Sequence, residues 1–246
     1  PYDLAYTRYT LEAAIAGAAI LDVDADLVER FKRSLELLPD YHQTPDPEQK
    51  GKSIIADWRD ATHDSVKKYN IAVPVVPLFP GDQFSWFSSE EEKELCRRCI
   101  QHVATRYNRN NSVVIINTAR ARLSMTDDAI EDTQQWFKSK ENPNGTFHWQ
   151  GHGDYMSEQA AVGALINEFL LQSVKGIIRV FPAWPEDKDA SFSNLRAEGG
   201  FLVTAEKRAG KISRLEIQST VGGKLRLLSP WPMLDVDVDS GKTRLK

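Results

Sequence analysis

The chain has 246 residues and a mass of 27.8 kDa, with 41% hydrophobic and 27% charged residues, enough for one large domain or two small ones. It has 31 basic and 35 acidic side chains, which gives a net charge of -4. Because there is no surplus of positive charge to neutralise a phosphate backbone, we expect no nucleic acid as the main partner. No apolar run approaches the roughly 20 residues of a membrane-spanning helix, and the first residues lack the features of a signal peptide. We therefore expect no membrane partner, and the compartment stays open.

The first part of the chain predicts a pair of helices. Residues 3–21 are rich in alanine and carry one apolar face, and residues 24–38 repeat apolar side chains with helical period until Pro39. Asp24 is placed to cap the second helix. The short turn between the two segments predicts an αα-hairpin.

A long connection follows at residues 40–88, punctuated by proline and of a length that is often functional. A capping box then predicts a helix that runs to about residue 107, because a serine and a glutamate three residues apart satisfy each other's backbone amides. The candidate pairs are Ser88 or Ser89 with Glu91 or Glu92.

Three more helical segments are predicted before the chain changes character. Residues 113–123 are apolar enough for a buried helix, although their β-branched side chains leave a strand open. Thr126 is expected to cap a helix over residues 127–138. From residue 157 apolar side chains recur with helical period, and this helix is expected to end near residue 173.

From about residue 176 short apolar runs alternate with Gly, Pro and Asp turns, which predicts an antiparallel β module. The alternation at residues 201–206 indicates one packed face. The predicted fold class is therefore mostly α: residues 1–175 form helical hairpins and residues 176–246 form the C-terminal antiparallel β module. The expected strands are 177–181, 200–206, 211–219, 224–228 and 234–238.

Two sequence patterns resemble metal or redox sites. Cys96 and Cys99 have a CxxC spacing, but it lies in the middle of a predicted helix rather than at the start of one, as redox motifs require. Asp235, Asp237 and Asp239 alternate as on a solvated strand face and lack the glycine and glutamate of a calcium loop. We expect neither a metal nor another cofactor.

The densest polar and aromatic cluster occupies residues 146–159, a glycine-bearing loop that leads into a helix. Aromatic faces stack on sugar rings, Gln and His bond hydroxyls, and carboxylates act as acid, base or nucleophile, so this composition is typical of sugar-handling enzymes. Glu158 also suits a helix start through the macrodipole alone, which leaves a structural role open. The candidate sugar contacts are His148, Trp149, Gln150 and His152, and the candidate catalytic carboxylates are Asp154 and Glu158.

Several segments carry a resemblance to glycoside hydrolase family 95, which contains α-L-fucosidases and some α-L-galactosidases. Residues 167–173 (N-E-F-L-L-Q-S) resemble its E-M-L-L-Q-S helix end, and residues 176–185 its I-x-L-L-P-A-L-P strand. Residues 190–203 are similar to its G-L-R-A-R-G-G-F entry into a C-terminal sheet, and residues 78–83 to its L-F-P-G-x-Q turn. The resemblance covers nearly the whole chain but only the later part of a typical member.

This resemblance implies an inverting exo-glycosidase in which these helices are part of an (α/α)6 barrel. It places the catalytic base at Asp154, with Glu158 as the alternative, and the general acid upstream of Pro1. The carbohydrate would then be the partner, together with the upstream part of the same protein, and an extracellular or periplasmic location is favoured. Residues 72–77 depart from the family, because they are apolar where members show H-x-S-H-L-Y, so the sugar stays open.

Two functions from different classes follow. The first is a glycoside hydrolase similar to the α-L-fucosidases, present as a partial chain. The second is a non-catalytic carbohydrate-binding or structural protein that keeps a glycosidase scaffold. A truncated chain without independent function is a third reading, and an exposed apolar helix face would favour it.

Overall fold

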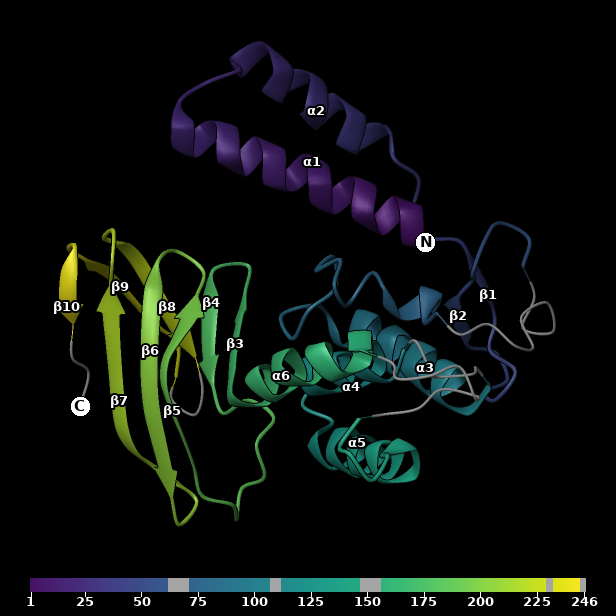
Figure 1. Ribbon diagram of the computed structural model, residues 1–246. Coiled ribbons are helices and arrows are strands. Elements are labelled where there is room, and N and C mark those ends of the chain that lie inside the picture. The colour runs from purple at the N-terminus through teal and green to yellow at the C-terminus, as the bar shows by residue number, and fades with distance from the viewer. Residues whose placement is uncertain (62–70, 107–111, 147–155, 229–231, 244–246) are drawn as a thin grey trace. The chain divides into compact units, whose positions relative to one another are not determined.

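The computed structural model describes residues 1–61, 71–106, 112–146, 156–228 and 232–243 (Figure 1), with the side chains of the last long helix described from residue 161. The chain divides into two compact units, an N-terminal unit, Pro1–Ala119, and a C-terminal unit, Arg120–Lys246. This division differs from the one predicted at residue 176, which follows sequence character and stays a prediction of domain organisation.

The N-terminal unit begins with the predicted helical hairpin, which is confirmed. Helix α1 (Tyr2–Leu21) and helix α2 (Ala25–Leu37) pack against each other across a tight turn. Asp22 and Asp24 both adopt left-handed backbone conformations there, which aspartate tolerates better than most residues. Asp24 occupies the N-cap position of α2 as expected, but its side chain makes no capping hydrogen bond.

The long connection after the hairpin contains regular structure that the sequence did not predict. Strands β1 (Gln43–Pro45) and β2 (Ser53–Ile55) form an antiparallel pair, and a short 3-10 helix, η2 (Val73–Val75), follows. Both elements pack against helix α3 (Glu90–Arg106). The buried apolar side chains of this unit include Ile54, Ile55, Val75, Val76, Ile100 and Val103.

The predicted capping box at the start of α3 is confirmed for one of the candidate pairs. The Ser89 amide donates to Glu92 Oε2 at 2.8 Å, and the Glu92 amide donates to Ser89 Oγ at 3.2 Å. Two amides that the helix leaves without intrahelical partners are satisfied in this way. The helix therefore begins where the sequence predicts it.

The unit boundary falls within helix α4 (Val113–Arg122), which confirms the buried-helix alternative for that segment. Helices α5 (Thr126–Lys140) and α6 (Met156–Leu170) belong to the C-terminal unit. The capping prediction for Thr126 is wrong, because the N-cap of α5 is Met125 and Thr126 is already helical.

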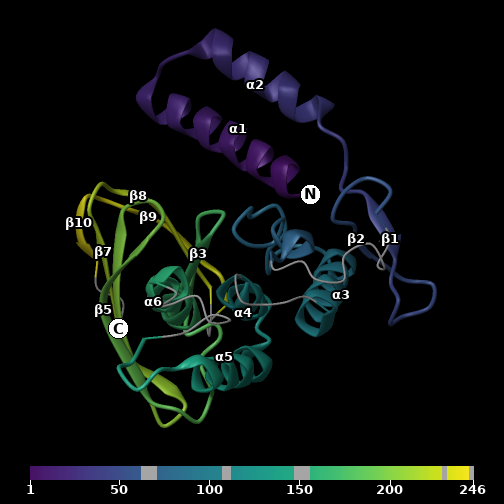
Figure 2. The same ribbon diagram turned by 45° about the vertical axis from the view of Figure 1, so that its right-hand side comes forward.

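The rest of the C-terminal unit consists of two four-stranded sheets (Figure 2). One sheet has the order β10-β7-β6-β5 and is antiparallel. The other has the order β3-β4-β8-β9 and is mixed, because β4 and β8 run parallel. Their strands are β3 (Leu171–Val174), β4 (Ile177–Val180), β5 (Ala190–Ala197), β6 (Phe201–Arg208), β7 (Lys211–Ser219), β8 (Gly223–Leu228), β9 (Leu234–Val238) and β10 (Gly241–Thr243).

The two sheets share one hydrophobic core, to which strands of both contribute buried side chains. The Phe181 and Phe192 rings meet there with centroids 5.3 Å apart, in an edge-on contact between the sheets. In β6 every second side chain, beginning with Phe201, is buried, as the predicted alternation requires. Other members of this core are Ile178, Val180, Val203, Ala205, Leu215, Ile217, Leu225 and Leu227.

The prediction of a mostly α chain with part of an (α/α)6 barrel is wrong. The described residues combine six α-helices with ten strands in three sheets, so the chain is a mixture of α and β structure. The C-terminal module is also not purely antiparallel. A parallel pair needs a crossover connection, and here strands β5 to β7, which belong to the other sheet, provide it between β4 and β8.

The predicted end of the last helix near residue 173 is also wrong, because α6 ends at Leu170 and β3 begins at Leu171. Strand β3 pairs with β4 through a two-residue turn at Lys175 and Gly176, which have φ values of 53° and 70°. Two successive positive φ values are typical of the hairpin turn that matches strand twist. Strand pairing therefore overrides the helical period of this segment.

Candidate functional site

Most of the sequence-predicted site lies outside the described residues. This applies to His148, Trp149, Gln150, His152 and Asp154. Glu158 lies in the first turn of α6, and its side chain is also outside the description. The catalytic and sugar-binding assignments of these six residues therefore stay predictions.

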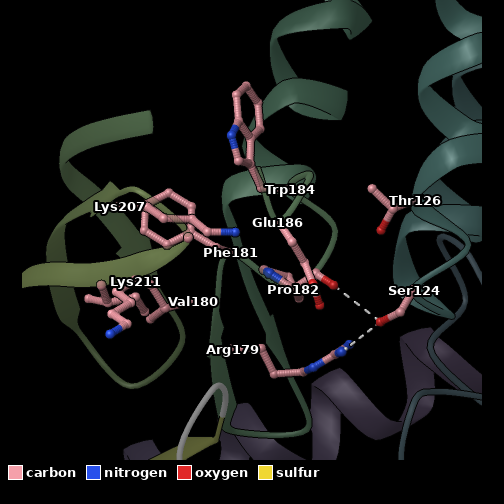
Figure 3. Close-up of a pocket in the computed structure, with 12 residues that line it drawn as sticks. Ser124, Thr126, Arg179, Val180, Phe181, Pro182, Trp184, Glu186, Lys207 and Lys211 are labelled. Atoms are coloured by element: carbon pink, nitrogen blue, oxygen red, sulfur yellow. Dashed lines mark hydrogen bonds between the residues drawn. The ribbon is translucent and has the colours of Figure 1, made fainter. Parts of the chain in front are cut away.

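The C-terminal unit contains a pocket of about 720 Å³, drawn in Figure 3. Three pieces of the unit line it: the turn from α4 into α5, the end of β4 with the segment that follows, and the hairpin between β6 and β7. Glu158 lies twelve residues before the end of α6 that adjoins β4, about 18 Å along the helix axis. None of the described residues that line the pocket belongs to the predicted catalytic loop. Its lining residues are Ser124, Thr126, Arg179, Val180, Phe181, Pro182, Trp184, Glu186, Lys207, Gly210, Lys211 and Ile212.

The charged groups of the pocket are mostly cationic. The described residues that line it include three cationic side chains, those of Arg179, Lys207 and Lys211. They include one carboxylate, that of Glu186. Lys211 and Glu186 are exposed, whereas Arg179 and Lys207 are only 5% and 7% exposed. A pocket wall of this kind has a positive potential that attracts anions.

Arg179 is held rigidly by neutral oxygen atoms of its own unit. Its Nη1 donates to Gln172 Oε1 at 2.9 Å, and its Nη2 donates to Ser124 Oγ at 2.9 Å (Figure 3). Burial, together with the nearby Arg122 guanidinium, lowers the pKa of Arg179 to about 10. The side chain is still protonated at neutral pH and contributes a fixed positive charge to the pocket.

Lys207 reaches the pocket because of its position in β6. It continues the inward alternation of Phe201, Val203 and Ala205, so its side chain starts on the buried face of the strand. Its Nζ donates to the carbonyl of Pro185 at 3.0 Å, and no carboxylate of the described residues lies within ion-pair distance. An ammonium offers three donors, so the other two are available to a ligand.

Trp184 adds a flat apolar surface to the same pocket. Part of the ring packs against the core of the two sheets, and its Nε1 donates to the carbonyl of Lys188 at 3.2 Å. This hydrogen bond fixes the orientation of the indole, which lines the pocket with its remaining surface. A fixed aromatic wall beside cationic side chains suits a ligand that has both a ring face and a negative charge.

A buried polar network supports the wall that carries Arg179. The Gln172 side chain is fully buried and donates to the carbonyls of Ala121 and Glu168, both at 3.0 Å. The Glu168 carboxylate in turn accepts two hydrogen bonds from Arg122, at 2.5 and 2.8 Å. Glu168 and Gln172 both belong to the segment that resembles family 95. The structure gives them a role in holding β3 and β4 to the helices, not in contacting a ligand.

A second pocket, of about 510 Å³, lies within the N-terminal unit and is lined by the half-exposed Trp58 together with Tyr41. The Tyr41 hydroxyl donates to Gln83 Oε1 at 2.8 Å, and burial raises the pKa of Tyr41 to about 12. Its other lining side chains are Pro1, Leu4, Pro39, Asp40, His42, Gln43, Ala56 and Arg59.

The cysteines and aspartates that resemble metal sites have ordinary structural surroundings. Cys96 and Cys99 are both buried in α3, and burial raises the pKa of both thiols. Asp235 forms an ion pair with Lys224 across the strand pair β8–β9, at 3.4 Å. Among the described residues no three His, Cys, Asp or Glu side chains gather as metal ligands would.

The sequence analysis missed the cationic pocket, although two signals for it were present. Arg179 is a charged residue inside an otherwise apolar strand, which indicates a buried cation with fixed partners. Lys207 falls on the apolar side of the period-two pattern that begins at Phe201. What the sequence could not supply is the distance between the two positions, because they are brought together by the packing of two different sheets.

Comparison with known proteins adds no family. No protein-family model matches this sequence, and no curated protein matches it significantly. The resemblance to glycoside hydrolase family 95 therefore depends on the motifs alone. None of the helices in the described part of the chain combines the length and apolar character needed to cross a membrane.

Proposed function

We propose that this chain acts on carbohydrate, as part of an inverting glycoside hydrolase of the α-L-fucosidase kind. The observation that carries the proposal is the loop at residues 146–159, which combines aromatic, amide, imidazole and carboxylate side chains at the entry to α6. A sugar can use each of these groups, through ring stacking, hydrogen bonds to hydroxyls and acid–base chemistry. The family-95-like motifs that follow this loop in the sequence support the same class.

In this proposal Asp154 is the base that activates water, with Glu158 as the alternative. Inverting enzymes place the base and the general acid about 6.5–9.5 Å apart, which leaves space for the attacking water between them. His148, Trp149, Gln150 and His152 then bind the sugar. The helix dipole at the start of α6 favours a carboxylate in its charged form, as a base requires.

The test is hydrolysis of a panel of aryl α-glycosides, including the fucoside and the galactoside, by the full-length enzyme that carries the upstream general acid. Asp154→Asn should abolish turnover, whereas Asp128→Asn, an exposed carboxylate in the first turn of α5, should leave it unchanged. Turnover that survives in Asp154→Asn but is lost in Glu158→Gln would move the base to Glu158. Turnover unaffected by either substitution would refute both assignments.

One observation favours the second function, a carbohydrate-binding protein without catalysis. Ala72 and Val75 occupy the positions at which family members carry two sugar-facing histidines, and both are buried, at 0% and 1% exposure. They belong to the apolar packing of the N-terminal unit and offer no hydrogen bond to a sugar. Oligosaccharide binding by calorimetry, with no turnover of any aryl glycoside by the full-length protein, would establish this alternative.

A further inference from the structure

The pocket of the C-terminal unit has chemistry that neither predicted function uses. Three cations, Arg179, Lys207 and Lys211, line it against one carboxylate, that of Glu186. This excess of positive charge is built into a chain whose net charge is -4. A local cationic pocket on an acidic protein indicates a specific negatively charged ligand, because the overall charge does not favour anions.

The burial of Lys207 strengthens this argument. Removing an ammonium from water is costly unless other groups replace its hydration. At Lys207 the Pro185 carbonyl supplies one hydrogen bond, and the side chain extends toward the segment that carries Trp184 and Glu186 (Figure 3). A ligand carboxylate or other oxyanion would provide charge compensation that the described residues around Lys207 do not.

The other walls define the remainder of the ligand. Trp184 presents an apolar face whose orientation is fixed by its hydrogen bond to Lys188. Thr126 lines the pocket with its hydroxyl group at the turn from α4 into α5, where the Ser124 hydroxyl already donates to the Pro182 carbonyl and accepts from Arg179 (Figure 3). An aromatic face together with a hydroxyl group suits a pyranose ring, whose faces are apolar and whose edge carries hydroxyls.

We propose that this pocket binds a uronate residue of an acidic oligosaccharide, with its carboxylate on Lys207 and its ring against Trp184, while the exposed Lys211 adds positive charge to the pocket. Arg179 lies behind the contact surface and strengthens the positive potential, while its hydrogen bonds to Gln172 and Ser124 keep it in place. The proposal extends the proposed carbohydrate function, since it takes the ligand class from that function. It adds a sugar site that selects for charge, built from residues outside the 146–159 segment.

Isothermal titration calorimetry of the 246-residue chain with oligogalacturonate, its methyl ester and inorganic sulfate tests the proposal. The oligogalacturonate should bind, and the neutral methyl ester should bind at least about tenfold more weakly, because it loses the charge-assisted hydrogen bonds. Binding of the methyl ester with equal affinity would overturn the role of the cations. Sulfate that binds as tightly as the oligogalacturonate would overturn the role of the sugar ring.

Variants locate the binding. Lys211→Met affects an exposed residue and should fold normally, and Lys207→Met keeps the length of the buried side chain without its charge; each should weaken binding by about tenfold. Trp184→Leu should weaken binding of oligogalacturonate but not of sulfate. Lys224→Met, which removes an exposed lysine of β8 outside the pocket, is the matched control and should bind as the unmodified chain does. Equal affinity in all four variants would refute the site.

The hydrolysis assay distinguishes this proposal from the proposed function. Absence of oligogalacturonate binding in a chain that hydrolyses an aryl glycoside would refute the uronate site alone. Oligogalacturonate binding that the Lys207 and Trp184 variants lose, without turnover of any glycoside by the full-length protein, would support the site and refute the proposed hydrolase.

Discussion

The two thiols of α3 show how burial determines the chemistry of a single residue. Cys96 and Cys99 are almost completely buried, and the Ile55 amide donates to Cys99 Sγ at 3.3 Å. Only a thiolate reacts readily with alkylating reagents, and burial disfavours it. At pH 8 we expect neither cysteine of the native chain to be alkylated by iodoacetamide, and both to be alkylated in urea. Intact-mass measurement after alkylation checks this, and rapid alkylation of the native chain would contradict the buried positions.

The same burial predicts a dependence of stability on pH. Burial raises the pKa of Cys99 from an ordinary value of 9.0 to about 12, so above pH 9 the unfolded chain loses this proton while the folded chain keeps it. A group whose pKa is higher in the folded state stabilises fully below its unfolded pKa, and the stabilisation is lost as the pH rises. The urea midpoint should therefore fall between pH 9 and pH 12. Cys99→Ala should show a smaller fall over the same range, and an identical fall would assign the effect to other groups.

In the polar network, substitution of Glu168 should reduce the free energy of unfolding most. Its carboxylate accepts two hydrogen bonds from the buried Arg122, and removal of one partner of a buried ion pair typically costs about 3–5 kcal/mol. We expect Glu168→Leu to reduce the free energy of unfolding by about 3 kcal/mol. Urea denaturation measures it, with Asp235→Leu as the control, because the Asp235–Lys224 pair is exposed and should contribute about 1 kcal/mol at most.

At the scale of elements, two glycines of the C-terminal unit provide a matched comparison. Gly176 has a φ of 70° in the turn between β3 and β4, where an added Cβ would also approach Arg226 Nη2. Gly163 lies inside α6 with open space around an added Cβ. Gly176→Ala should therefore destabilise the chain by about 1–3 kcal/mol, whereas Gly163→Ala should stabilise it by about 0.5–1 kcal/mol. Thermal unfolding of both variants checks the signs, and equal effects would contradict the assigned turn.

The elements that the sequence predicts well are those whose signals are local. The α1–α2 hairpin and the Ser89–Glu92 capping box depend on residues a few positions apart, and both are present as expected. The elements that it predicts poorly depend on distant partners. Residues 171–174 have the composition of a helix end but form β3, because pairing with β4 satisfies their backbone groups and three of their four side chains are buried. The parallel pair β4–β8 and the cationic pocket likewise depend on contacts between residues far apart in the chain.

The candidate sites also differ in how far the sequence alone reveals them. The loop at residues 146–159 stands out in the sequence because its sugar-binding residue types are contiguous. The pocket that contains Arg179 and Lys207 does not, because its residues come from segments that sequence analysis assigned to packing. The alternation that buries Phe201 and Val203 continues as far as Lys207, where a charged side chain takes the place of an apolar one. A buried cation at the end of an apolar pattern is a signal that sequence analysis can use in other proteins.

At the scale of the whole molecule, the helical hairpin of the N-terminal unit leaves apolar side chains open to solvent. Ile20 and Leu37 are 83% and 78% exposed, and the described side chains of α2 include none that is buried. Ile20 lies at the turn end of the hairpin and Leu37 at its other end, so apolar exposure occurs at both ends of the hairpin. The hairpin therefore contributes little burial to the stability of its own unit.

This exposure leads to a prediction that separates stability from association. Ile20→Ser and Leu37→Ser should each change the free energy of unfolding by no more than about 0.5 kcal/mol, because exposed side chains away from special features contribute little. The double variant should also show less concentration-dependent association by light scattering. Leu165→Ser is the contrasting variant, since Leu165 is buried in α6 and its loss should cost about 3 kcal/mol or more. A large loss of stability in the hairpin variants would mean that these side chains are packed in solution, and the exposed surface would then be refuted.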